Sequence, residues 1–485
     1  MKEFLTLVFS YGTINVFQKI IDYFSIALFV SLFSAEDYGL ISLNTILIFS
    51  LTSIVSLSLD GSLTRYYHKY VNEGKIQEFM GSIVSYLLLL LCVMAFLLLI
   101  PLKPVIILIF RDVEFYPYIF LVILISVIDP INRFYIAYLQ IKKDIKKYAI
   151  YYNSYVLTKL FSLILIAFIF QSTEFYFFAY LFSTFIFSLF TLFKLNRVIC
   201  WNLKFEYFIT AISYSIYYLP VILLVGLNSL VDRTYILNQL DLSSVGVYSA
   251  GSNIGNIVYL IAVIFNLAYV PIFIQSYEKS EHTFIDYTSE FSDLFVFCVL
   301  FSAFLVSIFS PFIANLLPFE YAQAALIVPV FAFVGVFNGL YFYYTNFMSL
   351  NKKLMRYKLL GVSLGFIANI GLTGVLVVHF GMLGAAFGTL VSVVIGSFVL
   401  KYLCVKVGGF ALNNKYFISS ISVFFISFFV VFLSTILPVY YIFIVNLGLI
   451  AIVLACFNLH FFVEKNYIIK NLKMVKNNVK IINIK

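Results

Sequence analysis

Charged side chains are scarce in this chain of 485 residues. Asp, Glu, Lys and Arg make up 11% of it and hydrophobic residues 63%, whereas charged residues form about 25% of an ordinary soluble domain. The mean hydropathy is +1.04. A soluble fold cannot bury so much apolar surface, so soluble enzymes and binding domains are excluded. The composition therefore predicts an all-α polytopic membrane protein.

Cysteine and histidine are also few, and their positions predict no chemistry. The cysteines lie in or beside apolar runs without metal-ligand spacing, as expected of small buried hydrophobes. The histidines are far apart in sequence and form no zinc or nucleophile signature. We therefore predict no metal, no cofactor and no enzymatic activity. The residues concerned are Cys92, Cys200, Cys298, Cys404, Cys456, His68, His282, His379 and His460.

Long apolar runs fill most of the chain. One span plus a short loop takes about 35 residues, which predicts roughly fourteen membrane-spanning helices. We place these spans near residues 5–33, 39–60, 77–102, 115–139, 149–170, 175–194, 207–237, 245–274, 291–317, 322–350, 357–379, 383–403, 415–437 and 439–463.

Lys and Arg are distributed unevenly over the loops. With the N-terminus inside, twenty-five of the 31 fall in inner segments and tails, and only Lys103 and Arg111 fall in outer turns. The positive-inside rule therefore predicts that both termini are cytoplasmic. The net charge of +9 is then a topology signal and an attraction to anionic lipid, and it does not indicate nucleic acid.

A short internal repeat divides the chain. Residues 38–42 follow the first span and residues 245–249 follow the seventh, with Gly39 and Gly246 separated by 207 positions. We predict two pseudo-symmetric six-helix lobes around a central cavity, plus two C-terminal helices. The predicted boundaries are 1–206 for the N-terminal lobe, 207–410 for the C-terminal lobe, 411–463 for helices 13 and 14, and 464–485 for a basic cytoplasmic tail.

Several segments carry a family resemblance. An acidic, aromatic and glycine turn occupies residues 34–39, Asp60-Gly61 ends the second apolar run, and Arg65-Tyr66 follows it. Residues 241–250 through Pro271, Asn351-Lys352-Lys353 and the turn at 379–386 come later in the order expected. Together they resemble the Wzx-type polysaccharide flippases of the multidrug/oligosaccharidyl-lipid/polysaccharide exporter superfamily. The departure from the family pattern is His379-Phe380, where one aromatic residue is usual.

The resemblance implies a function and partners. Such a flippase moves undecaprenyl-pyrophosphate-linked oligosaccharide repeat units to the outer leaflet for O-antigen, capsule or other exopolysaccharide synthesis, by alternating access. The implied partners are the polyprenyl-pyrophosphate-linked glycan, membrane lipid, and the glycan polymerase and chain-length machinery. The implied location is the bacterial cytoplasmic (inner) membrane. The alternative is a multidrug, organic-cation antiporter of the same superfamily.

Polar residues inside spans are the candidate site residues, since they are unfavourable in lipid. In the first span they follow helical spacing and form a polar stripe. A pyrophosphate in a low-dielectric cavity needs cations, and we predict that the headgroup binds Lys19, Lys159, Arg133, Arg65 and Arg233. For coupling or charge pairing we predict Asp22, Asp129 and Asp232. The predicted polar cavity residues are Asn15, Gln18, Asn153, Asn228, Asn253 and Asn256.

Structural roles compete with these assignments. The amides and hydroxyls can serve as interhelical hydrogen-bonding groups. Lys19, Lys159 and Arg133 can form ion pairs with Asp22 or Asp129, and Arg65 can lie on a solvated loop. A cation antiporter should display acidic residues with few buried lysines. Among the charged site candidates within the spans, four are basic (Lys19, Arg133, Lys159 and Arg233) and three are acidic (Asp22, Asp129 and Asp232), which favours an anionic cargo.

Overall fold

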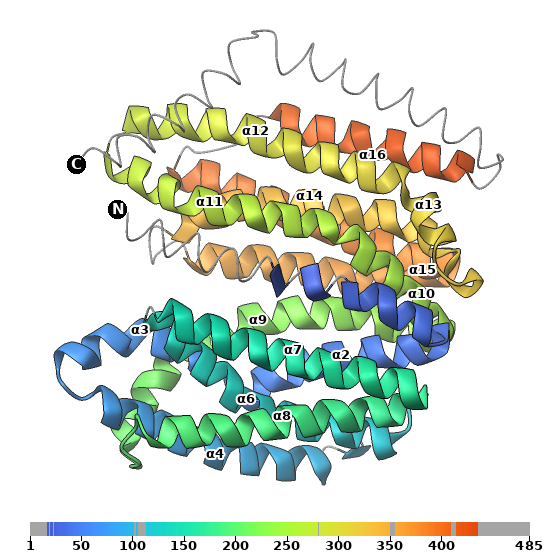
Figure 1. The fold of residues 1–485 in the computed structure, drawn as a ribbon. Helices are drawn as coiled ribbons and strands as arrows, with labels where there is room; N and C mark the ends of the chain where they lie inside the picture. Colours follow the sequence, from blue (N-terminus) through green and yellow to red (C-terminus); the bar gives the residue numbers. More distant parts are fainter. Residues whose placement is uncertain are drawn as a thin grey trace. The chain divides into compact units, whose positions relative to one another are not determined.

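The fold is taken from a computed structural model of the chain. It describes residues 17–18, 20–22, 24–100, 103–104, 113–142, 144–279, 281–349, 355–408 and 414–434. Every regular element among these residues is helical (Figure 1). Nine of the described helices are long and apolar enough to cross a membrane. The chain is therefore an all-helical, multi-pass membrane protein.

The described chain divides into two compact units. The first comprises residues Phe17–Ala250 and Val362–Ser392. It contains the helical segment Ile20–Leu32 and the elements α2 (Ala35–Val55), α3 (Leu59–Asn72), α4 (Ile76–Leu99), η1 (Phe115–Ile119), α6 (Phe120–Ile141), α7 (Ile145–Phe170), α8 (Thr173–Asn196) and α9 (Phe205–Gln239). Helix α6 packs against α2, α3, α4, α7 and α8, so it is the central helix of this unit.

The second unit includes Gly251–Gly361 and the described residues after Ser392. Helix α10 (Leu242–Gly255) connects the two units, and α15 (Met355–Gly408) has residues in both. Within the second unit α14 packs against α11, α12, α13 and α16. The bounds are α11 (Ile257–Lys279), α12 (Glu281–Ile308), α13 (Ser310–Asn315), η2 (Phe319–Tyr321), α14 (Ala324–Ser349) and α16 (Asn414–Ser434).

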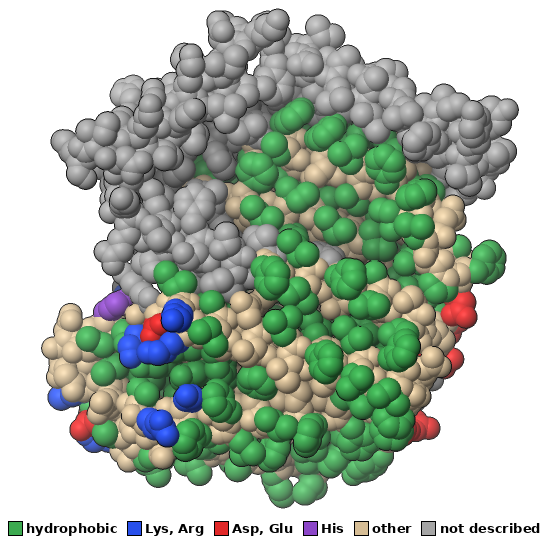
Figure 2. Space-filling view, in the orientation of Figure 1, with side chains coloured by type: hydrophobic (Ala, Val, Ile, Leu, Met, Phe, Trp, Pro, Cys, Tyr) green, Lys and Arg blue, Asp and Glu red, His purple; other side chains and the backbone are tan. Residues whose placement is uncertain are grey.

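Most of the predicted spans coincide with helices. The second to the thirteenth each fall on described helical residues. The first is described only from residue 17 onward, and the fourteenth, 439–463, lies outside the described residues. Large apolar side chains face outward from α7 and α8, with Phe161, Phe168 and Phe182 each between 66% and 71% exposed. Figure 2 shows hydrophobic side chains covering this face, as expected of a surface that contacts lipid.

The segment after the second span differs from its prediction. A solvated loop was one expectation for the segment around Arg65, and the structure instead forms α3. Helix α2 ends at Val55, and the chain turns through Leu57 and Ser58, whose φ angles are +48° and +50°. Leu59 and Leu63 are buried and one helical turn apart, whereas Arg65 is exposed, so α3 is amphipathic. The basic and aromatic residues of this segment hide the helical spacing of its apolar positions in the sequence.

The repeated glycines lie against each other. A Cβ atom added at Gly39 in α2 would overlap the carbonyl oxygen of Leu242 and lie 2.9 Å from the backbone nitrogen of Gly246. A Cβ at Gly246 in α10 would overlap the carbonyl oxygen of Ala35. The backbones of α2 and α10 therefore approach so closely that only glycine fits at either position.

Helix α15 is two helices joined at Gly381. Its φ of +57° and ψ of −137° interrupt the helical backbone there, in a region open mainly to glycine. Beyond the break, a Cβ at Gly384 would overlap backbone atoms of Leu376, and one at Gly388 would overlap the Thr373 hydroxyl. The two arms therefore form a tight hairpin, which confirms the predicted turn between the eleventh and twelfth spans.

Candidate functional site

An ion pair at the centre of the first unit anchors the first polar cluster. Asp129 and Arg133 are four residues apart on α6, and their Oδ2 and Nε atoms are 2.8 Å apart. The Tyr155 hydroxyl from α7 donates a hydrogen bond of 2.7 Å to Oδ1 of Asp129. Asp129 is buried, and the side chain of Arg133 is 33% exposed. The burial of the carboxylate is thus offset by two strong donors.

Lys159 lies beside this pair and is held by aromatic rings. Its Nζ is 5.4 Å from the ring centre of Tyr155 and 4.9 Å from that of Tyr180 on α8. Asp129 and Asp22 act on it electrostatically, but no carboxylate among the described residues is within ion-pair distance of it. Aromatic faces attract a cation without neutralising it. Lys159 therefore retains a positive charge that an anion can use.

The first helical segment contributes to the same place. Gln18 donates a hydrogen bond of 3.1 Å from its Nε2 atom to Oδ1 of Asn153 on α7. Asp22, one turn further on, acts electrostatically on Tyr152 as well as on Lys159. Lys19 and Asn15 lie outside the described residues. We name as the Lys159 cluster the residues Gln18, Asp22, Asp129, Arg133, Asn153, Tyr155, Lys159 and Tyr180.

Asp60 is a neighbour of this cluster that the sequence did not single out. It lies in the first turn of α3 and interacts electrostatically with Arg133. The guanidinium of Arg133 also lies 5.5 Å from the ring centre of Phe49. We interpreted Asp60 only as the end of the second span. The sequence feature that indicates Asp60 is that it is the first charged residue after the uncharged apolar run at residues 40–59.

A second cluster surrounds Asp232 on α9. Its carboxylate accepts hydrogen bonds from the Tyr248 hydroxyl (2.9 Å), the Asn369 amide (3.0 Å) and the Thr389 hydroxyl. Asn369 also donates to Oδ1 of Asn228 at 2.8 Å. Asp232 is 2% exposed. These residues, from α9, α10 and both arms of α15, are the Asp232 cluster.

Arg233 belongs to this second cluster and not to the first. Its Nε donates to the hydroxyls of Ser42 (3.2 Å) and Ser249 (3.1 Å), and one terminal nitrogen donates to the Ser229 carbonyl (3.0 Å). It is 5% exposed. The two clusters share no residue, so the predicted headgroup ligands are divided between two places in the first unit.

Three other predicted residues are not gathered into either cluster. Arg65 is exposed on α3, and nothing in the described part of the chain joins it to the Lys159 cluster. Asn253 and Asn256 fall in the second unit, and Asn256 marks the break between α10 and α11. Within the described residues, no group of three His, Cys, Asp or Glu side chains could hold a metal ion.

Sequence reasoning missed several members of the Asp232 cluster. The predicted site residues did not include Asn369, Tyr248, Thr389 or Ser42. Asn369 and Thr373 are four residues apart on an apolar helix, and the Thr373 hydroxyl donates to Oδ1 of Asn369 at 2.6 Å. Such a polar pair on an otherwise apolar arm is the signal that was available.

The arrangement of helices defines a class of fold, that of polytopic helical membrane proteins. A solved structure described as a lipid II flippase MurJ in an inward closed conformation is similar, with a TM-score of 0.63 and 14% identity; the match covers 87% of this chain and 97% of that one. An inward-facing multidrug resistance MATE family transporter of the MOP superfamily is similar with a TM-score of 0.57 and 14% identity, and the match covers 79% of this chain and 92% of that one. A Vibrio cholerae MATE transporter, VcmN, is similar with a TM-score of 0.54 and 13% identity, and the match covers 86% of this chain and 100% of that one.

These likenesses concern the fold. This chain has the fold shared by the lipid II flippase and the MATE transporters. No protein-family model matches the sequence, and no curated protein matches it.

Proposed function

We propose that this protein flips lipid-linked oligosaccharide repeat units, carried on undecaprenyl pyrophosphate, from the cytoplasmic to the outer leaflet. The product would enter O-antigen, capsule or another exopolysaccharide. The observation that carries the proposal is Lys159, a cation within a membrane-spanning helix, held by two tyrosine rings. A charged side chain inside a membrane-spanning helix costs free energy, so its presence there indicates a functional role.

The chemistry of the Lys159 cluster suits a pyrophosphate headgroup. Lys159 supplies a compact point charge, and Arg133 supplies a planar fork that is only partly used by Asp129. Tyr155 and Tyr180 present rings on which sugars can stack. When the headgroup enters, its oxygens replace the acceptors that now face these donors. The lipid II flippase among the similar folds moves a lipid-linked substrate, which is the basis for carrying that substrate class to this chain.

A multidrug, organic-cation antiporter is the second candidate. It is favoured by the buried carboxylate of Asp232. Three further carboxylates also favour it: Asp22 and Asp129, which act on Lys159, and Asp60, which acts on Arg133. The MATE transporters with the same fold are described as multidrug resistance proteins. An enzymatic role is not proposed, because the similar folds are those of transporters.

The wider setting belongs to the same proposal. The protein would reside in the bacterial inner membrane with both termini in the cytoplasm. Its lobes, 1–206 and 207–410, would rock in alternating access around the cargo. Helices at 411–463 and the tail at 464–485 would lie outside this core. Glycan polymerase and chain-length machinery would act on the product.

The decisive experiment measures lipid-linked intermediates in a deletion strain carrying variants. Lys159→Ala should abolish complementation and cause lipid-linked oligosaccharide to accumulate on the inner side. Lys159→Arg should retain part of the activity, because it keeps a cation. Lys69→Ala, on exposed α3, is the matched control and should behave as wild type.

The same strains separate the two candidates. If Lys159→Ala leaves glycan export intact but changes resistance to cationic drugs, the antiporter is the correct function. If neither export nor resistance responds to deletion of the protein, both proposals fail.

A further inference from the structure

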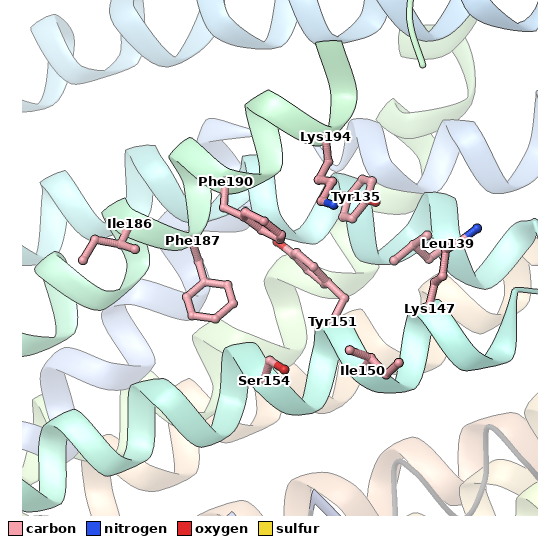
Figure 3. Close-up of a pocket in the computed structure, with 10 residues that line it drawn as sticks. All are labelled: Tyr135, Leu139, Lys147, Ile150, Tyr151, Ser154, Ile186, Phe187, Phe190 and Lys194. Carbon is pink, nitrogen blue, oxygen red and sulfur yellow. The ribbon is translucent and has the colours of Figure 1, made fainter. Parts of the chain in front are cut away.

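A groove outside the two clusters lies between α6, α7 and α8. Its volume is about 520 Å³, within the range of about 300–1,000 Å³ that ligand pockets span. Figure 3 shows the side chains that line it, with Phe187 and Phe190 on α8 and Tyr151 on α7 between the helices. Tyr135, Leu139 and Tyr151 are its most buried lining residues. These three are 2% to 8% exposed, so they form its floor.

The hydroxyl of Tyr151, on the floor of the groove, is already hydrogen-bonded. The Tyr151 hydroxyl is hydrogen-bonded to Oδ1 of Asn132 at 3.1 Å and to the Thr191 hydroxyl. Asn132 also donates to Ser188 at 2.8 Å and accepts from Thr191 at 2.8 Å. These polar groups satisfy one another beneath the groove, which leaves aromatic and aliphatic surface toward its interior.

One end of the groove is positively charged. Among the described residues, Lys147 and Lys194 are the only charged ones that line it, and they come from the start of α7 and the end of α8. Lys194 makes no ion pair within the described residues; its Nζ lies 5.0 Å from the Phe190 ring centre. Lys147 pairs with Asp144 at 2.9 Å, and its hydrogen bond holds the pKa of that carboxyl below the usual value.

Further cations surround this end. Lys142, Lys146 and Arg197 are exposed at the same helix ends, where Asp144 is the one carboxylate among the described residues of 138–148 and 190–199. Figure 2 shows Lys and Arg side chains gathered at one end of this face, at the left of the view. The positive-inside rule assigns such an end to the cytoplasmic headgroup layer.

The groove opens to the surface that the bilayer covers. Ile150 on α7 and Ile186 and Phe190 on α8 line it and are 58%, 47% and 45% exposed. On α7, Tyr155 of the Lys159 cluster lies one turn beyond Tyr151, and the rings of both contact Phe187. The groove is thus reached from lipid and adjoins the proposed cargo site, but no residue belongs to both.

We propose that this groove binds an anionic phospholipid of the cytoplasmic leaflet. Its phosphate lies between Lys147 and Lys194, and one acyl chain lies over Tyr135, Leu139 and Tyr151. Two cations at headgroup level and an apolar channel toward the bilayer interior match the two halves of such a lipid. Basic pockets between membrane helices on the cytoplasmic side hold anionic lipid headgroups by the same chemistry.

The test uses the purified full chain and phosphatidylglycerol with a photoactivatable group partway along one acyl chain, at the depth of Ser154 and Phe187. We expect crosslinks to peptides around Ile150 and Ser154 of α7 and around Phe187 of α8. Lys147→Gln with Lys194→Gln should reduce this labelling about twenty-fivefold, since each basic residue near an anionic lipid contributes about fivefold. Lys69→Gln with Lys75→Gln, on another basic segment, is the matched control and should label as wild type.

Two further variants keep both lysines and act in opposite directions. Ser154→Trp fills the groove and should reduce labelling. Asp144→Asn keeps an oxygen that can accept from the Lys147 N–H, as Asp144 now does at 3.2 Å, but it removes the competing charge and should increase labelling. If the lysine double variant fails to fold, these two decide.

Three outcomes overturn the proposal. Equal labelling by a phosphatidylcholine probe would show that the groove does not recognise the negative charge of the lipid. Labelling that ignores both the lysine pair and Ser154→Trp would place the lipid elsewhere. Displacement of the probe by undecaprenyl phosphate in preference to unlabelled phosphatidylglycerol would identify the occupant as a cargo tail.

Discussion

Tyr155 combines two roles in the Lys159 cluster. Its hydroxyl donates to the buried carboxylate of Asp129, and its ring faces the ammonium of Lys159. One side chain thereby fixes the position of an ion pair and of a separate cation. The high tyrosine content of the chain, 37 residues, acquires a specific meaning here, because a phenol is the side chain that offers both a donor and an aromatic face.

Substitution of Tyr155 separates these roles. Tyr155→Phe keeps the ring but leaves Asp129 without one of its donors, so we expect a loss of about 1–3 kcal/mol in stability with flipping activity retained. Tyr155→Ala should lose both stability and activity. Thermal melts in detergent and complementation measure the two effects. Tyr86→Phe is the control, since its hydroxyl bonds the Leu203 carbonyl at an exposed site. An active Tyr155→Ala protein would contradict the role of the ring.

At the scale of the helix, the crossing of α2 and α10 depends on two glycines. Gly39→Ala would drive a methyl group into the backbone of Leu242, and the helices would have to separate. Overpacking of this kind destabilises by about 1–3 kcal/mol or more. Gly371→Ala is the matched control, because no atom lies within 4 Å of a Cβ at that helical position. A lowered melting temperature for Gly39→Ala alone is expected; equal effects of the two substitutions would disprove the close crossing.

The sequence predicted helices better than it predicted their ends and neighbours. Long uncharged runs locate spans because a helix needs about 20 apolar residues to cross the bilayer. The amphipathic α3 was missed because its buried positions, Leu59 and Leu63, are few and lie among charges. The turn at Gly381 was predicted because its glycines and its aromatic residue form a recognisable pattern.

The candidate site was predictable only in part, for a similar reason. Asp129 and Arg133 are neighbours on one helix, so spacing alone suggests their pairing. Asp232 and Asn369 are 137 residues apart and meet only through tertiary packing. Spacing within a single sequence contains no information about such a contact.

At the scale of the whole molecule, orientation is the first property to test. Single cysteines at Phe319, which is 94% exposed, and at Glu73, which is exposed beyond α3, should lie on opposite sides. The background must replace the exposed Cys92 and Cys200. A membrane-impermeant maleimide added to intact cells should label the Phe319 site and spare the Glu73 site. Labelling of both or of Glu73 alone would refute the predicted topology.

The driving force is the second such property. A pyrophosphate headgroup carries roughly two negative charges, and its outward movement gains about 2.3 kcal/mol per charge per 100 mV, so about 5 kcal/mol in all. We therefore expect an imposed potential, without an ion gradient, to accelerate flipping in proteoliposomes. Asp232→Asn should remove any added dependence on sodium or protons while leaving the response to voltage; Asp241→Asn, at an exposed helix start, is the control. Transport that follows an ion gradient and ignores voltage would contradict this prediction.

The break at Gly381 also bears on how the protein is made. Because the two arms of α15 meet without a polar loop between them, little hydrophilic chain is available to cross the bilayer between their insertions. Backbone groups at such a turn need partners within protein, and the close approach at Gly384 and Gly388 provides packing as soon as both arms exist. The arms should therefore leave the translocon together, as one unit. In a nascent chain halted after residue 381, the first arm would not insert stably into the lipid until the second arm had been synthesised.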